Sequence, residues 1–288
     1  VAVVWGASYP VTKIALAHAP VLVLIFYRFF ATACIMAVLA RHELASASKG
    51  DLFRAAALGA ILAAIFTAEI AGLAHASATN AALIISLCTL FTPFLDSALS
   101  LKLPPKIVIL GAVIACAGVG LLAGGLTTWS FGEALILVAA GLRSVMVVST
   151  KRLMAGRSLS SVALTATQAF VVSLAALAML VSSQGLGELA VEAGVEFWLS
   201  VAFLSLFCTI AAFYVQNAAV RRTTPTRVGL LMGTEPLFGF ALARLLLSEP
   251  VTAWTLTGAV LIVAGTFLGI SAEGDPIVND AEARHRSA

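Results

Sequence analysis

Carboxylates stand inside apolar stretches of this 288-residue chain, where a bilayer would surround them. A charge at mid-membrane costs about 2.5–3.5 kcal/mol, so it persists only where it is paired, hydrated or facing a cavity. Glu69 can bind a cargo ammonium group or exchange a proton, or it can be a structural partner for Arg28 or Arg143. Glu235 precedes Pro236, and a proline within a helix leaves one backbone carbonyl without its hydrogen bond. The Glu235 carboxylate either belongs to a transport site at such a broken helix or only stabilises the kink.

Arginines occupy the same apolar stretches. For Arg28 we favour a structural ion pair or a carbonyl clamp over cargo contact, because bidentate donors suit fixed partners. Arg143 can hold a cargo carboxylate or phosphate, and structural pairing with Glu69 is an equal alternative. Lys13 and Arg244 are expected to extend their charged ends toward the membrane surface.

Aromatic and uncharged polar side chains complete the candidate set. Those of the first segment can contact cargo or form an interfacial belt. The amides within apolar runs can bind cargo, although helix–helix hydrogen bonds of about 0.6 kcal/mol explain them nearly as well. The candidate cargo-binding residues are Trp5, Ser8, Tyr9, Glu69, Asn80, Arg143, Gln216, Asn217 and Glu235. Of these, Glu69 and Glu235 are the candidates for proton coupling.

Composition places these residues in a membrane protein. The chain is 61% hydrophobic and 11% charged, whereas soluble domains carry roughly 25% charged residues. A net charge of +3 gives no indication of nucleic-acid binding. No Walker loop, His-Glu-x-x-His, Gly-x-Ser-x-Gly or Cys-x-x-Cys motif occurs, and the histidines lie at loops, segment ends or the tail. We therefore expect no enzyme, no cofactor and no metal site.

Ten apolar segments of about bilayer-spanning length follow one another. They are 1–17, 20–40, 53–75, 78–100, 105–125, 131–150, 160–182, 196–219, 225–247 and 252–271. Thirteen of the 17 basic residues fall in alternate connections or the tail, and the opposite connections have none. The positive-inside rule then predicts a multi-pass inner-membrane protein with both termini in the cytoplasm. The first segment is short, so we expect native residues before it.

A repeated phrase indicates an internal duplication. The stretch 111–118 reappears as 258–265, and the same offset of 147 gives 14 identities between positions 64 and 118. Both phrases begin and end on Gly seven residues apart, which gives a smooth helix face for close packing. Since each unit has five segments, the two repeats must run in opposite senses. We predict repeats at 1–125 and 131–271, followed by a cytoplasmic tail at 272–288.

Several motifs resemble the drug/metabolite transporter superfamily of the EamA type. They are Trp5-Gly6-Ala7-Ser8 with Lys13, Pro20 with Arg28-Phe29, Ala78-Thr79-Asn80-Ala81-Ala82 with Pro93, Gly132-Glu133, Glu235-Pro236-Leu237-Phe238, and Ser248-Glu249-Pro250. Two features depart from the family pattern. Leu101-Lys102-Leu103-Pro104 replaces a Gly-Glu ending, and Arg143 stands where an aromatic or small residue is usual.

The resemblance implies an all-α membrane protein with ten transmembrane helices and a cavity near mid-membrane. Segments one, three, four, six, eight and nine would line this cavity, and segments five and ten would support it. We therefore predict a monomeric secondary transporter in the lipid bilayer that exports small metabolites, such as amino acids or drugs, by alternating access. The alternatives are a non-transporting membrane scaffold or sensor and a membrane-embedded enzyme.

Overall fold

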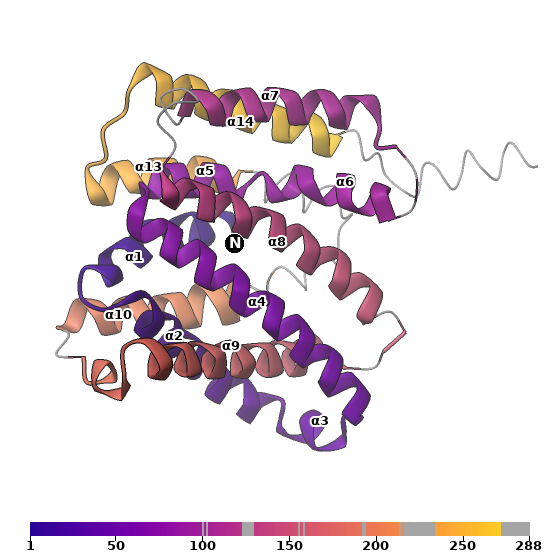
Figure 1. Cartoon of the computed structure of the whole chain (residues 1–288), viewed down its shortest axis with the longest axis vertical. Helices are drawn as coiled ribbons and strands as arrows, with labels where there is room; N and C mark the ends of the chain where they lie inside the picture. The colour runs from indigo at the N-terminus through magenta and orange to yellow at the C-terminus, as the bar shows by residue number, and fades with distance from the viewer. Residues whose placement is uncertain are drawn as a thin grey trace, which may run out of the picture.

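The computed structural model describes residues 1–99, 101, 103–122, 130–154, 156–157, 159–191, 194–212, 215 and 234–271. This described part is helical and contains no strand, as the sequence predicted (Figure 1). The α-helices are α1 Ala2–Leu16, α2 Val21–Leu39, α3 Arg41–Ser46, α4 Lys49–His75, α5 Ala78–Ile85, α6 Cys88–Leu99, α7 Lys106–Leu122, α8 Phe131–Leu153, α9 Ser161–Ser183, α10 Val195–Phe203, α13 Glu235–Leu247 and α14 Ala253–Ser271. A 3-10 helix, η1 Leu186–Leu189, precedes α10, and a π-helix, η2 Leu204–Ala211, follows it.

Length and hydropathy identify the membrane-crossing elements. In the described part, five helical stretches are long and apolar enough to cross a bilayer: α2, α4, the combined α5–α6 stretch, α8 and α9. Shorter apolar helices cover Lys106–Leu121, Val195–Ala211 and Ala253–Gly269. Each of the ten predicted segments contains a described helix. These elements make the chain a multi-pass membrane protein.

Serine residues begin four of the apolar helices. The side chains of Ser48, Ser77, Ser130 and Ser160 each accept a hydrogen bond from the backbone N–H three residues later. At α8, the Glu133 side chain also accepts from the Ser130 backbone, which completes a capping box. These caps satisfy amides that the helices themselves leave unpaired. The capped starts lie within a few residues of the segment breaks predicted from the sequence.

Two predicted segments are not uniform helices. The segment 78–100 divides into α5 and α6, because the Ser86 hydroxyl donates to the Leu83 carbonyl and the Thr89 hydroxyl donates to Ser86. Such local side-chain bonds compete with the helical ladder. The segment 196–219 changes from α10 to the wider π-turns of η2, where Thr209 donates to the Leu204 carbonyl five residues back. Hydroxyl residues thus reshape both spans.

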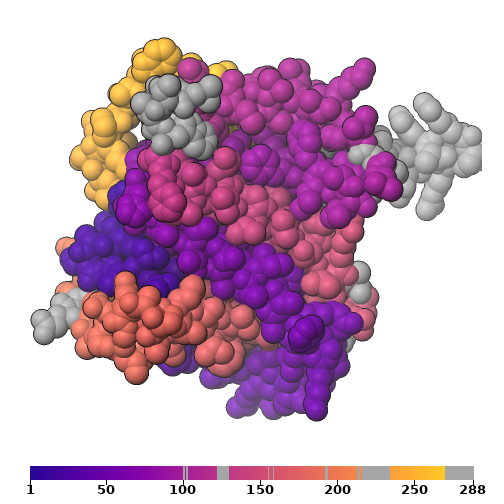
Figure 2. Space-filling view, in the orientation of Figure 1, coloured from indigo at the N-terminus to yellow at the C-terminus, as the bar shows by residue number. Residues whose placement is uncertain are grey.

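Helices from the two predicted repeats pack against one another. The pairs α2–α9, α4–α8 and α1–α13 each join one helix from either side of residue 130. One buried apolar cluster centres on α5 and α8 and extends to α7 and α14, and a second centres on α2, α4 and α9. Figure 2 shows the indigo surface of the N-terminal helices directly against a coral surface from the second half of the chain. Helix α1 also contacts α10. The core therefore lies between the two halves of the chain.

Glycines bring α7 and α14 together along one edge of the bundle (Figure 1). A methyl group on Gly111 would lie 2.5 Å from the Gly265 carbonyl oxygen, and one on Gly118 would lie 2.7 Å from the Gly258 carbonyl oxygen. Only glycine permits so close an approach of two backbones. The two repeated phrases are therefore each other's packing surface, as the smooth faces predicted.

Large apolar side chains cover much of the outer surface. Phe53 is 76% exposed, Leu245 75% and Trp254 63%. In water such side chains would carry a large hydration cost, whereas lipid solvates them. The exposed apolar surface is consistent with a bundle that faces hydrocarbon.

Candidate functional site

An ion pair joins α4 to α8 inside the bundle. Glu69 Oε2 accepts hydrogen bonds from Arg143 Nη2 at 2.7 Å and from Arg143 Nε at 3.2 Å. The Glu69 side chain is 9% exposed and that of Arg143 is 32% exposed. Two donors from one guanidinium hold the carboxylate in a fixed orientation. Of the partners considered for Glu69, the structure selects Arg143.

A second polar pair joins α1 to α13. Tyr9 Oη donates a 2.9 Å hydrogen bond to Glu235 Oε1, and Tyr9 is only 2% exposed. Pro236 lies in the first turn of α13, where a missing N–H leaves no helical bond broken. The Glu235-Pro236 pair therefore begins α13 instead of kinking its described part. This start places the Glu235 carboxylate against α1.

These two pairs form one cluster, which we call the central cluster: Tyr9, Glu69, Arg143 and Glu235. Its side chains come from four helices and interact electrostatically with one another. The cluster contains two carboxylates and a single guanidinium, which binds only Glu69 directly, so the cluster carries an excess negative charge when both carboxylates are ionised. Such a cluster can attract a cation or a proton, and its arginine can bind a carboxylate if Glu69 releases it.

Two neighbours of the cluster, Cys88 and Ser144, were not among the candidate residues predicted from the sequence. Cys88 interacts electrostatically with Arg143 and Glu235, and its carbonyl accepts a 2.9 Å hydrogen bond from Ser144 Oγ. The sequence repeat could have identified Cys88, because the offset of 147 makes position 88 equivalent to position 235, which is the candidate Glu235. The two positions of the duplicated sequence thus lie near the same site.

Trp5 and Ser8 have other partners on α1. The Trp5 indole N–H donates to the Cys208 carbonyl oxygen at 2.8 Å, which places Trp5 at the contact of α1 with η2. The Ser8 hydroxyl donates to the Trp5 carbonyl of its own helix at 2.6 Å. These contacts tie both side chains to helix packing in this conformation.

Asn80 lies in the first turn of α5, away from the Glu69–Arg143 pair. Its amide donates to Glu133 Oε1 at 2.5 Å, at the point where α5 and α8 both begin. Glu133 was recognised in the sequence only as part of a motif. The remaining two candidates, Gln216 and Asn217, lie outside the described residues.

Arg28 is buried among aromatic rings. Its guanidinium carbon lies 4.8 Å from the centre of the Phe66 ring and 5.4 Å from that of Phe29. Its hydrogen bond to Thr209 Oγ1 is long, at 3.5 Å, and it forms no ion pair within the described residues. The expected ion pair or carbonyl clamp is therefore replaced by cation–π contacts.

Lys13 and Arg244 bind backbone carbonyls. The Lys13 ammonium donates to the carbonyl oxygens of Leu73, at 3.2 Å, and Ala76. Arg244 donates to the carbonyl oxygens of Ser248 and Glu249, just after α13 ends. Both contacts place a cation at a helix C-terminus, where the helix dipole favours it. The extension of Lys13 and Arg244 toward the membrane surface stays a prediction.

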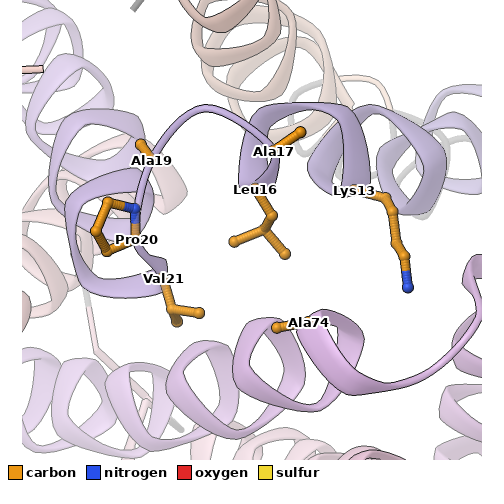
Figure 3. Close-up of a pocket in the computed structure, with 7 residues that line it drawn as sticks. All are labelled: Lys13, Leu16, Ala17, Ala19, Pro20, Val21 and Ala74. Atoms are coloured by element: carbon orange, nitrogen blue, oxygen red, sulfur yellow. The ribbon is translucent and has the colours of Figure 1, made fainter. Parts of the chain in front are cut away.

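A pocket of about 450 Å³ opens beside Lys13. It lies between the α1–α2 connection and α4, and its other lining side chains are apolar (Figure 3). In that view the Lys13 side chain points down toward the turn that follows α4. None of the central-cluster residues lines this pocket. The pocket and the cluster are therefore separate features.

Apolar helices that surround paired charges between two halves of a chain are typical of a membrane transporter. The chain belongs to the EamA-like transporter family, which matches residues 1–124 and 130–271. This confirms the resemblance seen in the sequence and points to a membrane transporter, not to an enzyme.

Two further comparisons agree with this class. A probable amino-acid metabolite efflux pump of Salmonella typhimurium (strain LT2) is 36% identical over 72 residues, which are 25% of this chain and 24% of that protein. The match thus spans about a quarter of the relative. One solved crystal structure of a protein shares the fold with a TM-score of 0.67, covering 93% of each chain at 16% identity.

Proposed function

We propose that this chain is an inner-membrane secondary transporter that exports small metabolites by alternating access. The observation that carries the proposal is the central cluster, in which helices from both halves of the chain hold two carboxylates and one guanidinium. Charges buried in a membrane are costly, and transporters use them to bind cargo and ions. A scaffold or sensor has no comparable need for them.

Ten membrane spans in two inverted repeats provide the framework for this mechanism. The ten apolar segments, the offset of 147 and the alternation of basic connections support it. With both termini in the cytoplasm, α4 ends and α5 begins at the outer surface. Inverted halves have two conformations of similar energy, one open to each side. The protein works as a monomer in the lipid bilayer.

Amino acids and related zwitterions suit the central cluster. A cargo carboxylate replaces Glu69 as the partner of Arg143, and the released Glu69 or Glu235 then holds the cargo ammonium group. Tyr9 orients the Glu235 carboxylate through its hydrogen bond. A proton on either carboxylate weakens its hold on the ammonium group, which couples cargo release to protonation. The similarity to an amino-acid metabolite efflux pump supports this cargo class.

Counterflow in proteoliposomes tests the proposal. Vesicles that contain the purified chain and unlabelled amino acids should accumulate labelled amino acid, and nucleotides and common drugs form the comparison panel. Glu69→Gln and Glu235→Gln, at matched protein content, should lower the rate and flatten its dependence on pH. Glu188→Gln is the control, because Glu188 lies exposed in η1.

Two outcomes would contradict the proposal. Absence of counterflow with every compound in the panel would favour the scaffold, the sensor or the membrane-embedded enzyme. Normal rates and pH dependence in both variants would leave transport in place but would remove the two carboxylates from the mechanism. The two results are distinguishable, since the first concerns the wild-type chain.

A further inference from the structure

One turn of the chain receives polar contacts from several other helices. It is the α4–α5 turn, residues 76–79, where α4 ends and α5 begins. Glu249, which follows α13, accepts the Ala78 backbone N–H on Oε1 at 2.7 Å and the Thr79 backbone N–H on Oε2 at 3.0 Å. Each carboxylate oxygen of Glu249 therefore accepts a hydrogen bond from one of two successive backbone amides, which lie 171 and 170 positions away in the sequence.

This contact completes the start of α5. The first amides of a helix have no partner within the helix. Here the Ser77 hydroxyl accepts the Asn80 backbone N–H at 2.9 Å, and Glu249 accepts the two that precede it. A carboxylate on backbone amides at a helix N-terminus forms charge-assisted bonds that the helix dipole strengthens. The first turn of α5 is thus held by a residue of the other half of the chain.

The other side of the same turn, where α4 ends, is also held. Lys13 of α1 donates to the carbonyl oxygens of Leu73 and Ala76, where α4 ends. Lys13 and Glu249 also attract each other electrostatically. One cation and one carboxylate therefore bind the two helix ends whose dipoles favour them, and they draw α1 and the end of α13 onto the α4–α5 turn.

The helices that reach this turn also carry the central cluster. Tyr9 lies one helical turn before Lys13 on α1, and Glu235 begins α13, which ends just before Glu249. The 13 residues of α13 span about 20 Å, close to the distance from the centre of a bilayer to its surface. A rigid helix therefore connects the Tyr9–Glu235 bond to the Glu249 contact.

We propose that Glu249 is a positioning residue that keeps the outer end of the transport pathway closed, with Lys13 as its counterpart on the other side of the α4–α5 turn. This inference rests on the proposed alternating access. When α13 moves with Glu235, its far end withdraws the Glu249 carboxylate from the α5 amides. The outer ends of α1, α5 and α13 then separate, and the central cluster opens to the outside.

Thiol labelling of the full-length chain in intact cells tests this closure without any cargo. Cys88 beside the central cluster is kept as the reporter, and Cys34, Cys116 and Cys208 are replaced by Ser. A membrane-impermeant maleimide is added from outside. Glu249→Gln keeps one acceptor oxygen and loses the charge, so we expect labelling of Cys88 about tenfold faster than in the Glu249 parent, the change that loss of one charge-assisted bond produces.

Lys13→Met is the second variant and should change labelling in the same direction, because it releases the other side of the turn. Glu188→Gln is the matched carboxylate control and should leave the labelling rate unchanged. Detergent size-exclusion chromatography checks that each variant is folded. An unchanged Cys88 rate in folded Glu249→Gln or Lys13→Met would overturn the inference, as would an equal rise in Glu188→Gln.

The two proposals fail in different ways. If the transport function is wrong, wild-type counterflow is absent, whatever the labelling rates show. If only the outer closure is wrong, wild-type counterflow is present and Glu249→Gln leaves Cys88 labelling unchanged. Faster labelling of Glu249→Gln from the inside alone would also overturn the closure, because it would place the Glu249 contact on the opposite side of the membrane.

Discussion

Gly6 and Gly239 pack backbone against backbone where α1 meets α13, and a methyl group on Gly6 would lie 2.7 Å from the Gly239 nitrogen. A methyl carbon cannot approach a backbone nitrogen so closely, so any side chain at position 6 must push the two helices apart. The Tyr9–Glu235 hydrogen bond joins these same helices. The geometry of the central cluster therefore depends on the absence of a side chain at Gly6.

We expect Gly6→Ala to destabilise the fold by about 1–3 kcal/mol through overpacking and to lower transport more than stability alone explains. Gly141→Ala is the matched control, because a methyl group there meets nothing within 4 Å. Thermal unfolding in detergent and proteoliposome counterflow measure the two effects. Equal behaviour of the two variants would show that the α1–α13 contact tolerates a side chain.

Tyr9→Phe should cost about 1–2 kcal/mol of stability, because it removes one buried hydrogen bond and leaves Glu235 without that donor. Tyr27→Phe removes a comparable hydroxyl, which donates to the Leu189 carbonyl at 2.7 Å outside the cluster. Both variants should unfold at lower temperature, whereas only Tyr9→Phe should slow counterflow. A similar loss of transport in both variants would show that Tyr9 has no specific role in transport.

The Glu69–Arg143 pair should show strong coupling in a double-mutant cycle. Arg143→Met alone leaves the buried Glu69 carboxylate unpaired and should cost about 1–3 kcal/mol, a value reduced by the partial exposure of Arg143. Adding Glu69→Gln should recover part of that loss. Thermal unfolding of the four proteins gives the coupling energy, and additive effects would mean that the pair contributes little.

Labelling of single cysteines, introduced after the four native cysteines are replaced by Ser, tests the orientation of the chain. Ser46→Cys lies in α3, in a connection that carries basic residues, and Gly187→Cys lies in η1, in a connection without them. An impermeant maleimide added to intact cells should label only Gly187→Cys, and permeabilisation should expose Ser46→Cys. Labelling of both from outside would contradict the orientation that the alternation of basic connections predicts, and with it the proposed inverted repeats.

The sequence predicted the helical segments because hydropathy is a local property. It also narrowed the partners of Glu69 to two arginines, since few charges occur within the apolar segments. It did not predict which arginine would pair, because that choice depends on how α4 packs against α8. The break between α5 and α6 was missed for a different reason, since Ser86 and Thr89 form local bonds that hydropathy does not register.

The contacts that connect the two halves were hardest to predict. Tyr9 and Glu235 are 226 positions apart, and Glu249 binds amides about 170 positions away. A backbone amide has no signature in the side-chain sequence, so the sequence identified Glu249 only as part of a motif. Asn80 was placed among cargo residues by its polarity, whereas its partner is Glu133 in the capping box of α8.

Helix α7 of the first half packs against helix α14 of the second half through facing glycines. Because the last helix of each half supplies one face of that pair, the halves are joined by helix packing as well as by the covalent link between them. A gene divided between residues 122 and 130 should therefore yield two fragments that find each other in the membrane.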